Sequence, residues 1–164
     1  MAIKFTDNSA AVKGAMHDAA MQFLEESAML VQRDAAKNTA SASGQLKGSW
    51  DHIVDSGELK ATVGNPSEYA IWQEMGTGEY ALNGNGRKGY WVYVEGGGGG
   101  KSGGSSKQYT LQEAKKVVAY LRSQGLAAVY TNGSKPRRML HSAYTNNKSR
   151  IIQRASQIFK GRIG

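Results

Sequence analysis

The chain has 164 residues, of which 40% are apolar, and it contains no cysteine. This length supports one compact core, and the absence of thiols excludes disulfide frameworks and zinc sites built on cysteine. The first residues lack the apolar stretch of a signal peptide, and no run approaches the ~20 apolar residues of a bilayer span. We therefore expect one domain, 1–164, that is made in a cytoplasm and does not contact membranes.

The net charge of +8 favours a polyanionic or acidic partner over an isolated soluble enzyme. The basic residues continue to the C-terminus from position 134 with no Asp or Glu among them: Lys135, Arg137, Arg138, Lys148, Arg150, Arg154, Lys160 and Arg162. Such a run is either a solvated helix face or a surface that contacts a partner.

Residues 10–37 are predicted to form a long amphipathic helix, because apolar residues recur at helical spacing: Val12, Met16, Ala19, Ala20, Phe23, Leu24, Leu30 and Val31. Asp7, Asn8 or Ser9 can cap its first turn. At 1.5 Å per residue the helix would be about 40 Å long, which is more than a small core requires. We expect part of it to pack on another subunit.

Two strand-like runs follow at 49–54 and 58–63, and the turn-forming residues between them predict a β-hairpin. Residues 67–75 are predicted to form a short amphipathic segment that ends at Gly76, Thr77 and Gly78. Residues 90–95, rich in β-formers, predict a third strand.

The segment 96–106 contains only Gly, Ser and Lys and predicts a flexible loop. Thr110 and Glu113 form a capping box that opens a helix over 110–124, and a fourth strand follows at 126–131. The last helix has an apolar stripe, with Arg150 and Lys160 pointing away from it: Leu140, Tyr144, Ile151, Ala155, Ile158 and Phe159. The fold class is α+β, with a long N-terminal helix, a small, mostly antiparallel sheet of about four strands, an inserted helix and a C-terminal helix.

The glycine run that ends in Lys101-Ser102 resembles a phosphate-binding loop, but its spacing fails. Glu95 holds the place of the first required glycine, and no helix starts at the Lys-Ser pair. The histidines at 17, 52 and 141 lie on three different predicted elements, and no nucleophile elbow exists. We therefore expect no catalytic residue, no metal and no cofactor, and hence no enzyme.

Aromatic residues accompany the predicted sheet: Trp50, Tyr69, Trp72, Tyr90, Trp91 and Tyr93. They are either core residues or a stacking platform for single-stranded nucleic acid. The core interpretation is favoured, because the chain has few other large apolar residues.

Three groups of residues, taken in order, resemble a known family. They are Ala35-Ala36-Lys37 with Ser43-Gly44-Gln45-Leu46-Lys47-Gly48-Ser49; Val63-Gly64 with Tyr69-Ala70 and Gln73-Glu74-Met75-Gly76-Thr77-Gly78; and Lys135-Pro136-Arg137-Arg138-Met139-Leu140 with Ala143. This order resembles the minor tail and neck proteins of long-tailed double-stranded DNA bacteriophages. The chain departs from the family pattern at Ser43, Met75 and Arg138-Met139, and 79–134 looks like an insertion.

The resemblance implies a structural virion protein of the neck or tail. It would be a ring subunit, by resemblance a hexamer, that completes the tail and joins it to the head while leaving a DNA channel. The implied partners are other copies of the chain, a head-connector or stopper protein, a tail terminator or tail-tube protein, and the passing genome. The alternative is a basic, non-enzymatic nucleic-acid-binding protein.

Candidate assembly residues come from the matched segments: Gly44, Leu46, Glu74, Gly76, Thr77, Arg137 and Arg138. We place the Glu74 carboxylate at the edge of the sheet, and expect changes at Glu74 or Gly76 to spare the fold and impair assembly. Contacts to the DNA channel or to a partner are expected from the last helix: Lys148, Arg150, Arg154, Lys160 and Arg162.

Overall fold

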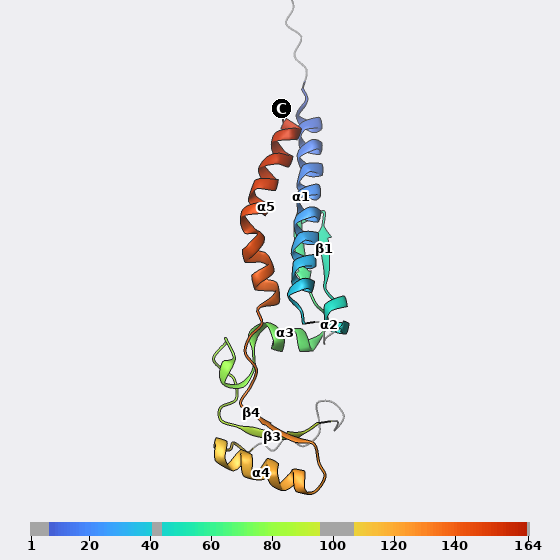
Figure 1. Ribbon diagram of the computed structural model, residues 1–164. Helices are drawn as coiled ribbons and strands as arrows, with labels where there is room; N and C mark the ends of the chain where they lie inside the picture. The colour runs from blue at the N-terminus through green and yellow to red at the C-terminus, as the bar shows by residue number, and fades with distance from the viewer. Residues whose placement is uncertain (1–6, 41–43, 96–106, 164) are drawn as a thin grey trace, which may run out of the picture. The chain divides into compact units, whose positions relative to one another are not determined.

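The computed structural model describes residues 7–40, 44–95 and 107–163 (Figure 1). The chain divides into two compact units: Met1–Ala70 with Met139–Gly164, here called the helical unit, and Ile71–Arg138, here called the inserted unit. Each has its own cluster of buried apolar residues. The fold is α+β, as the sequence predicts, while the assignment of a single domain stays a prediction.

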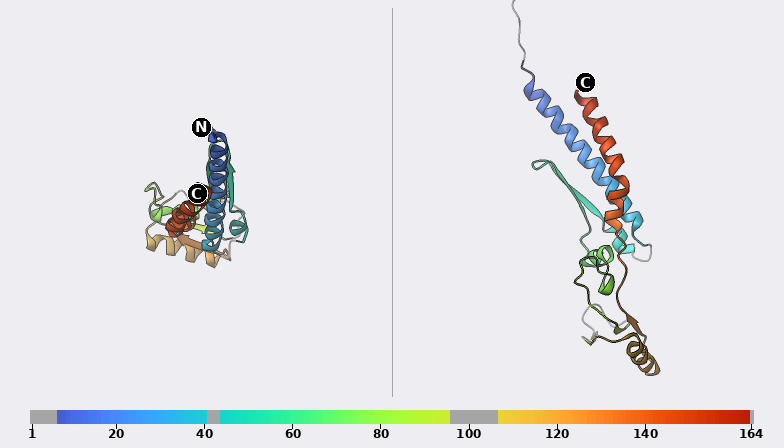
Figure 2. Two further views of the ribbon diagram at one scale, coloured as in Figure 1. Left: turned by 90° about the horizontal axis from the view of Figure 1, so that it is seen from above. Right: turned by 90° about the vertical axis from the view of Figure 1, so that its left-hand side faces the viewer.

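Two long helices form the helical unit, α1 (Ser9–Asn38) and α5 (Met139–Ile163), and they lie side by side in all three views (Figures 1 and 2). They run antiparallel, since Phe23, midway along α1, meets Phe159 near the end of α5, and the amide of Asn38 at the end of α1 donates to Met139 O at the start of α5. The buried positions of α1 are mostly alanines, which allow close approach. Side-chain hydrogen bonds also join the two helices.

One polar pair joins the middles of the two helices. Arg154 of α5 donates two hydrogen bonds to Glu26 of α1, and this pairing lowers the pKa of Glu26 to about 2. A second pair lies deeper, where the buried Asn147 amide donates to Asp34 Oδ2 (2.7 Å) and to Ala143 O (2.8 Å). The hydrogen bond from Asn147 is also the main cause of the lowered pKa of Asp34.

The other side of α1 packs against a β-hairpin made of β1 (Asp51–Asp55) and β2 (Lys60–Gly64). The strands are antiparallel, with Ile53 opposite Thr62. At the turn, Asp55 Oδ1 accepts from the backbone N–H groups of Glu58 and Gly57, which lowers the pKa of Asp55. The hairpin is confirmed, with a turn one residue longer than predicted.

A buried cluster lies where α1 ends and α5 begins in the helical unit. Trp50 Nε1 donates to Thr39 Oγ1 (2.8 Å), and Thr39 in turn donates to Ala35 O (2.9 Å). Thr39 Oγ1 also lies 3.3 Å from the sulfur of Met139, the first residue of α5 and the largest fully buried side chain. Leu46, from the short helix α2 (Gly44–Gly48), and Ala70, from α3 (Glu68–Met75), complete this cluster.

The inserted unit is a two-stranded sheet covered by one helix. Strands β3 (Trp91–Val94) and β4 (Ala128–Thr131) pair antiparallel, and α4 (Leu111–Ser123) packs on them through Ala114 and Val118 (Figure 1). The predicted capping box is present, because Glu113 N donates to Thr110 Oγ1 and the Glu113 carboxylate accepts from Thr110 N. A 3₁₀ turn, Gly78–Tyr80, precedes the sheet.

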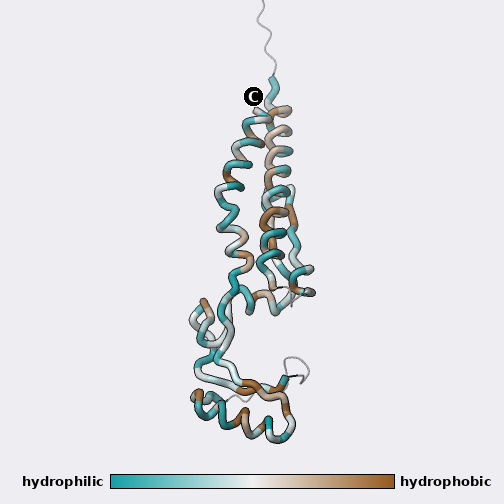
Figure 3. Tube along the Cα trace, viewed as in Figure 1, coloured by the Kyte–Doolittle hydropathy of each residue, from teal (hydrophilic) through white to brown (hydrophobic). Residues whose placement is uncertain are grey.

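Several expectations from the sequence are wrong in detail. The strands form two separate two-stranded sheets, because each pair packs on a different helix. Of the aromatic residues predicted as core, Trp50 is buried but Tyr69, Trp72 and Tyr93 are exposed. In the last helix Tyr144 is 50% exposed, and the buried positions are Met139, Ala143, Asn147 and Ile158. Figure 3 shows the resulting mostly hydrophilic character of α5.

The hydroxyl of Thr39 is predicted to be required for stability. Thr39→Val keeps the shape but leaves the buried Trp50 N–H without its acceptor, which should lower the free energy of unfolding by about 1–3 kcal/mol. Urea denaturation followed by tryptophan fluorescence measures this change. The control is Thr62→Val on the exposed face of β2, which should be near neutral; equal effects of the two variants would contradict the role of Thr39.

The pairing of Glu26 with Arg154 predicts a dependence of stability on pH. Because the folded-state pKa of Glu26 lies below its ordinary value of 4.5, its contribution is fully present above pH 4.5 and is lost as pH falls through about 2. The melting temperature of Glu26→Gln should therefore lie below that of wild type at neutral pH and converge with it in this window. Asp18→Asn, in the same helix, is the control; a constant gap down to pH 2 would argue against the pair.

Candidate functional site

The most specific segment of the resemblance, Gln73 to Gly78, meets the returning chain inside the inserted unit. Thr77 N donates to Ser134 O (2.9 Å), Ser134 N donates to Thr77 Oγ1 (3.0 Å), and Glu79 N donates to Asn132 O (2.9 Å). The outgoing chain at 76–79 and the returning chain at 132–134 are thus joined by backbone hydrogen bonds across more than fifty residues. We call this contact the crossing.

The crossing explains why glycine stands at positions 76 and 78. Gly76 has φ +75°, and a Cβ there would lie 2.9 Å from the backbone of both Ser134 and Pro136. Gly78 has φ +60°, and its Cβ would lie 2.1 Å from Asn132 O. Left-handed backbone and close approach each disfavour a side chain, so Gly76 and Gly78 serve the fold of one chain. The expectation that changing Gly76 spares the fold is therefore wrong.

The remaining candidates of this region lie next to the crossing. Glu74 is in α3 and not at the edge of a sheet, which corrects the expected placement. The returning chain binds the end of α3, because Arg137 N donates to Gln73 O (2.7 Å) and Arg138 N to Glu74 O (3.3 Å). Both arginine side chains are exposed, and Arg138 has a positive φ of 50°.

Leu46 and Gly44 differ in what they do. Leu46 is 5% exposed and belongs to the core of the helical unit, so it is unavailable as a surface contact. Gly44 is exposed, its φ is not positive, and a Cβ there would meet nothing within 4 Å. The structure gives no steric reason for glycine at this position.

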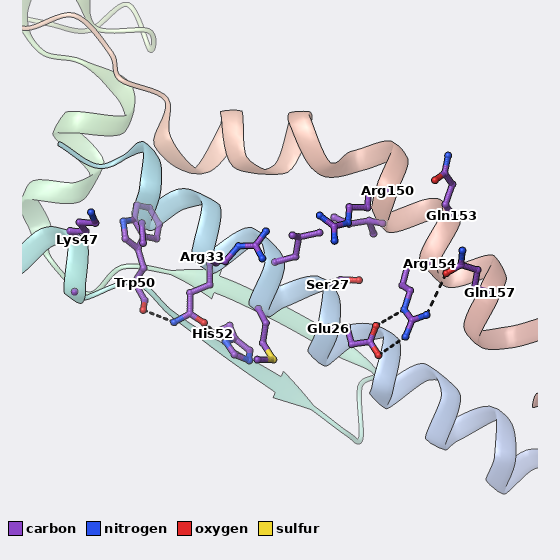
Figure 4. A pocket seen from close by; sticks show the side chains of 16 residues that line it. Glu26, Ser27, Arg33, Lys47, Trp50, His52, Arg150, Gln153, Arg154 and Gln157 are labelled. Carbon is purple, nitrogen blue, oxygen red and sulfur yellow. Dashed lines mark hydrogen bonds and ion pairs between the residues drawn. The ribbon is translucent and has the colours of Figure 1, made fainter. Parts of the chain in front are cut away.

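A groove of about 1030 Å³ runs along the helical unit between α1, α5 and the hairpin (Figure 4). Its apolar lining comes from Met29, Leu30, Trp50 and Ile151. Its charged lining is mainly basic, from Arg33, Lys47, Arg150 and Arg154, against one carboxylate, Glu26. Arg33 bonds Asp34, and Arg154 bonds Glu26.

The groove does not bring catalytic groups together among the described residues. The ring nitrogens of His52 contact Gln32 Oε1 and Glu25 Oε1, so the imidazole does not face a nucleophile. The buried Ser27 hydroxyl has no hydrogen-bond partner among the described residues, so no base there activates it as a nucleophile. No group of metal-binding side chains occurs in the described ranges, and the glycine run ending at Ser102 lies outside them.

The structure separates the basic residues of the last helix by role. Arg154, expected as a contact to DNA or a partner, holds α5 to α1 through Glu26. Lys148, Arg150, Lys160 and Arg162 are exposed and open to such contacts. The pair of Glu26 and Arg154 was missed in the sequence, because no local spacing signals a partner 128 residues away.

A graded series of glycine variants tests the crossing. Gly64→Ala meets no neighbour and needs no positive φ, so it should be near neutral, whereas Gly84→Ala, at φ +73° in open space, should cost about 1–2 kcal/mol through backbone strain alone. Gly76→Ala adds a clash with backbone and should exceed Gly84→Ala in urea denaturation. Equal losses at positions 76 and 84 would show that the crossing tolerates a side chain.

No helix in the described ranges is long and apolar enough to cross a membrane.

Comparison with known proteins identifies a family for one segment of the chain. Neither the curated proteins nor the solved structures contain a match. Residues 3–76, which include α1, α2, the hairpin and α3, match the HK97-gp10-like family, described as "Bacteriophage HK97-gp10, putative tail-component". Over this segment, somewhat less than half of its length, the chain is similar to that family of bacteriophage tail components, which confirms the resemblance to phage tail proteins found in the sequence.

Proposed function

We propose that the chain is a structural virion protein, a ring subunit at the head–tail junction or tail end of a tailed phage. It completes the tail and connects it to the head while leaving a channel for DNA, and it catalyses no reaction. The matched family supports the tail assignment. The ring, its six-fold symmetry and its neighbours, a connector or stopper on one side and a terminator or tube protein on the other, come from the wider family resemblance.

The observation that carries the proposal is an imbalance of large apolar side chains. In the described part of the chain seventeen large apolar side chains are exposed, while only seven apolar residues larger than alanine are buried, and the other seven buried apolar residues are alanines. A monomer that functions alone would place more of these side chains in its core, so such a surface supports the proposal that other chains contact it.

The large exposed apolar residues of the helical unit occur on four elements. They are Val12, Met16 and Met29 on α1, Ile53 and Leu59 on the hairpin, Tyr69 on α3, and Tyr144 and Ile152 on α5. Surfaces on different sides of one chain suit head-to-tail contacts, in which one patch of a subunit meets a different patch of the next. Repeated by a rotation that closes, such contacts form a ring.

The proposal predicts that Ile53→Asp prevents assembly without unfolding the subunit. Ile53 is 71% exposed, so its melting temperature should change little. In an assembled ring the new carboxylate would be buried without a partner, at a cost of several kcal/mol, and joined particles should fall more than about tenfold. Electron microscopy of lysates from a phage carrying the variant gene would count free heads, free tails and joined particles.

Ser56→Asp is the matched control, because it adds the same charge to the exposed turn of the same hairpin and removes no apolar side chain. It should leave joining intact. A double variant, Ile53→Asp with Ile152→Asp, that folds and still gives wild-type numbers of joined particles would refute these surfaces as subunit contacts. Absence of the protein from purified virions by mass spectrometry would refute the structural role itself.

A further inference from the structure

The excess positive charge is distributed unevenly between the two units. The helical unit contains eleven Lys and Arg against nine Asp and Glu, whereas the inserted unit contains ten against four. Of the net charge of +8, the inserted unit therefore carries +6 and the helical unit +2. The basic run that begins at position 134 is divided between the units: five of its eight cations lie in α5, where the acidic residues of 1–70 largely offset them, and three lie in the inserted unit.

Two acidic groups of the inserted unit, both exposed, are hydrogen-bonded within the unit. The Glu113 carboxylate caps α4 by accepting from Thr110 N (2.8 Å). The Glu79 carboxylate accepts from Asn132 Nδ2 (3.1 Å) and Gly89 N (3.2 Å). The hydrogen bonds from Thr110 lower the pKa of Glu113, and the nearby charges of Lys107 and Lys116 lower it further. The lysines of α4 are exposed to solvent.

Helix α4 has two distinct faces. Ala114 and Val118 are buried against the sheet, and Leu121 packs beside them. The opposite face presents Lys115, Lys116 and Tyr120, with Tyr120 one helical turn after Lys116 and 66% exposed. This face therefore has two cations and an aromatic ring, none of which is part of the buried core of the unit.

We propose that the outward face of α4 binds the phosphodiester backbone of DNA, without sequence preference. Lysine ammonium groups bind phosphate oxygens and release condensed counterions. A tyrosine beside them adds a hydroxyl donor to phosphate or a ring that stacks on an unpaired base. This contact goes beyond the proposed role in the tail, since a ring subunit can join head to tail with no DNA-binding surface on its inserted unit.

The test compares α4 with α5 through matched variants of the full chain. Lys115→Gln/Lys116→Gln removes two exposed lysines from α4, and Lys148→Gln/Lys160→Gln removes two exposed lysines from α5. Binding to single-stranded and to double-stranded DNA of equal length is measured by fluorescence anisotropy from about 50 to 200 mM salt. The α4 variant should bind more weakly, with a log–log salt slope that is shallower by about 1.8, roughly 0.9 per lost contact. The α5 variant should lose less, although the sequence expects Lys148 and Lys160 to contact DNA or a partner, because acidic residues of the helical unit offset the cations of that helix.

Two tyrosine variants test whether the aromatic ring of Tyr120 contacts DNA or whether the lysine charges alone bind it. Tyr120→Ala should weaken binding of single-stranded DNA about fivefold or more if the ring stacks on bases. Tyr144→Ala, on α5 and 50% exposed, should have no effect. All six substituted positions are exposed, so unchanged melting temperatures verify the fold.

Three results would overturn the inference. They are equal weakening by the α4 and α5 lysine variants, absence of binding by wild type at about 50 mM salt, and binding of polyglutamate as tight as that of DNA with the same loss in the α4 variant. The last result would identify an acidic protein as the ligand. None of them bears on the assembly phenotype of Ile53→Asp, so failure here is distinguishable from failure of the proposed role in the tail.

Discussion

The helical unit depends on the hydrogen bond between Trp50 and Thr39 at the end of α1. The hydroxyl of Thr39 contacts three groups. It accepts a hydrogen bond from the indole N–H of Trp50, donates to Ala35 O in the last turn of α1, and lies against the sulfur of Met139, the first residue of α5. An indole N–H buried without an acceptor is costly, so this one threonine fixes where the helix ends and where the chain returns. The long antiparallel contact of α1 with α5 is then set in register from this end, and the pair of Glu26 and Arg154 holds its middle.

The segments that resemble phage tail proteins are largely explained by contacts within one chain. Ala35, Leu46, Ala70, Met139 and Ala143 form one apolar cluster, although they come from three separate segments of the sequence. The Gly-Thr-Gly segment is required by the crossing, where the backbones approach too closely for a Cβ. Much of the resemblance therefore reports how the subunit folds. Surfaces for other subunits are better sought among exposed apolar residues such as Ile53 and Ile152.

The net positive charge equals that of residues 134–164, and the two units carry unequal shares of it. The basic run of α5 faces a helix with carboxylates, and Arg154 illustrates the result, since its guanidinium is bound by Glu26. The inserted unit lacks this balance. A subunit with an apolar surface on its helical unit and a cationic surface on its inserted unit can contact protein with one and a polyanion with the other.

The sequence by itself determined the local features: the long first helix, the hairpin, the capping box of Thr110 and Glu113, and the α+β class. Each of these follows from spacing or capping within a few residues, which is information that a short window contains. Only the tertiary structure decided that the four strands form two sheets, that Trp50 is buried while Trp72 is exposed, and that Arg154 meets Glu26. These outcomes depend on contacts between residues far apart in the chain. Neither periodicity nor composition specifies which of several equally amphipathic helices and strands pack against one another.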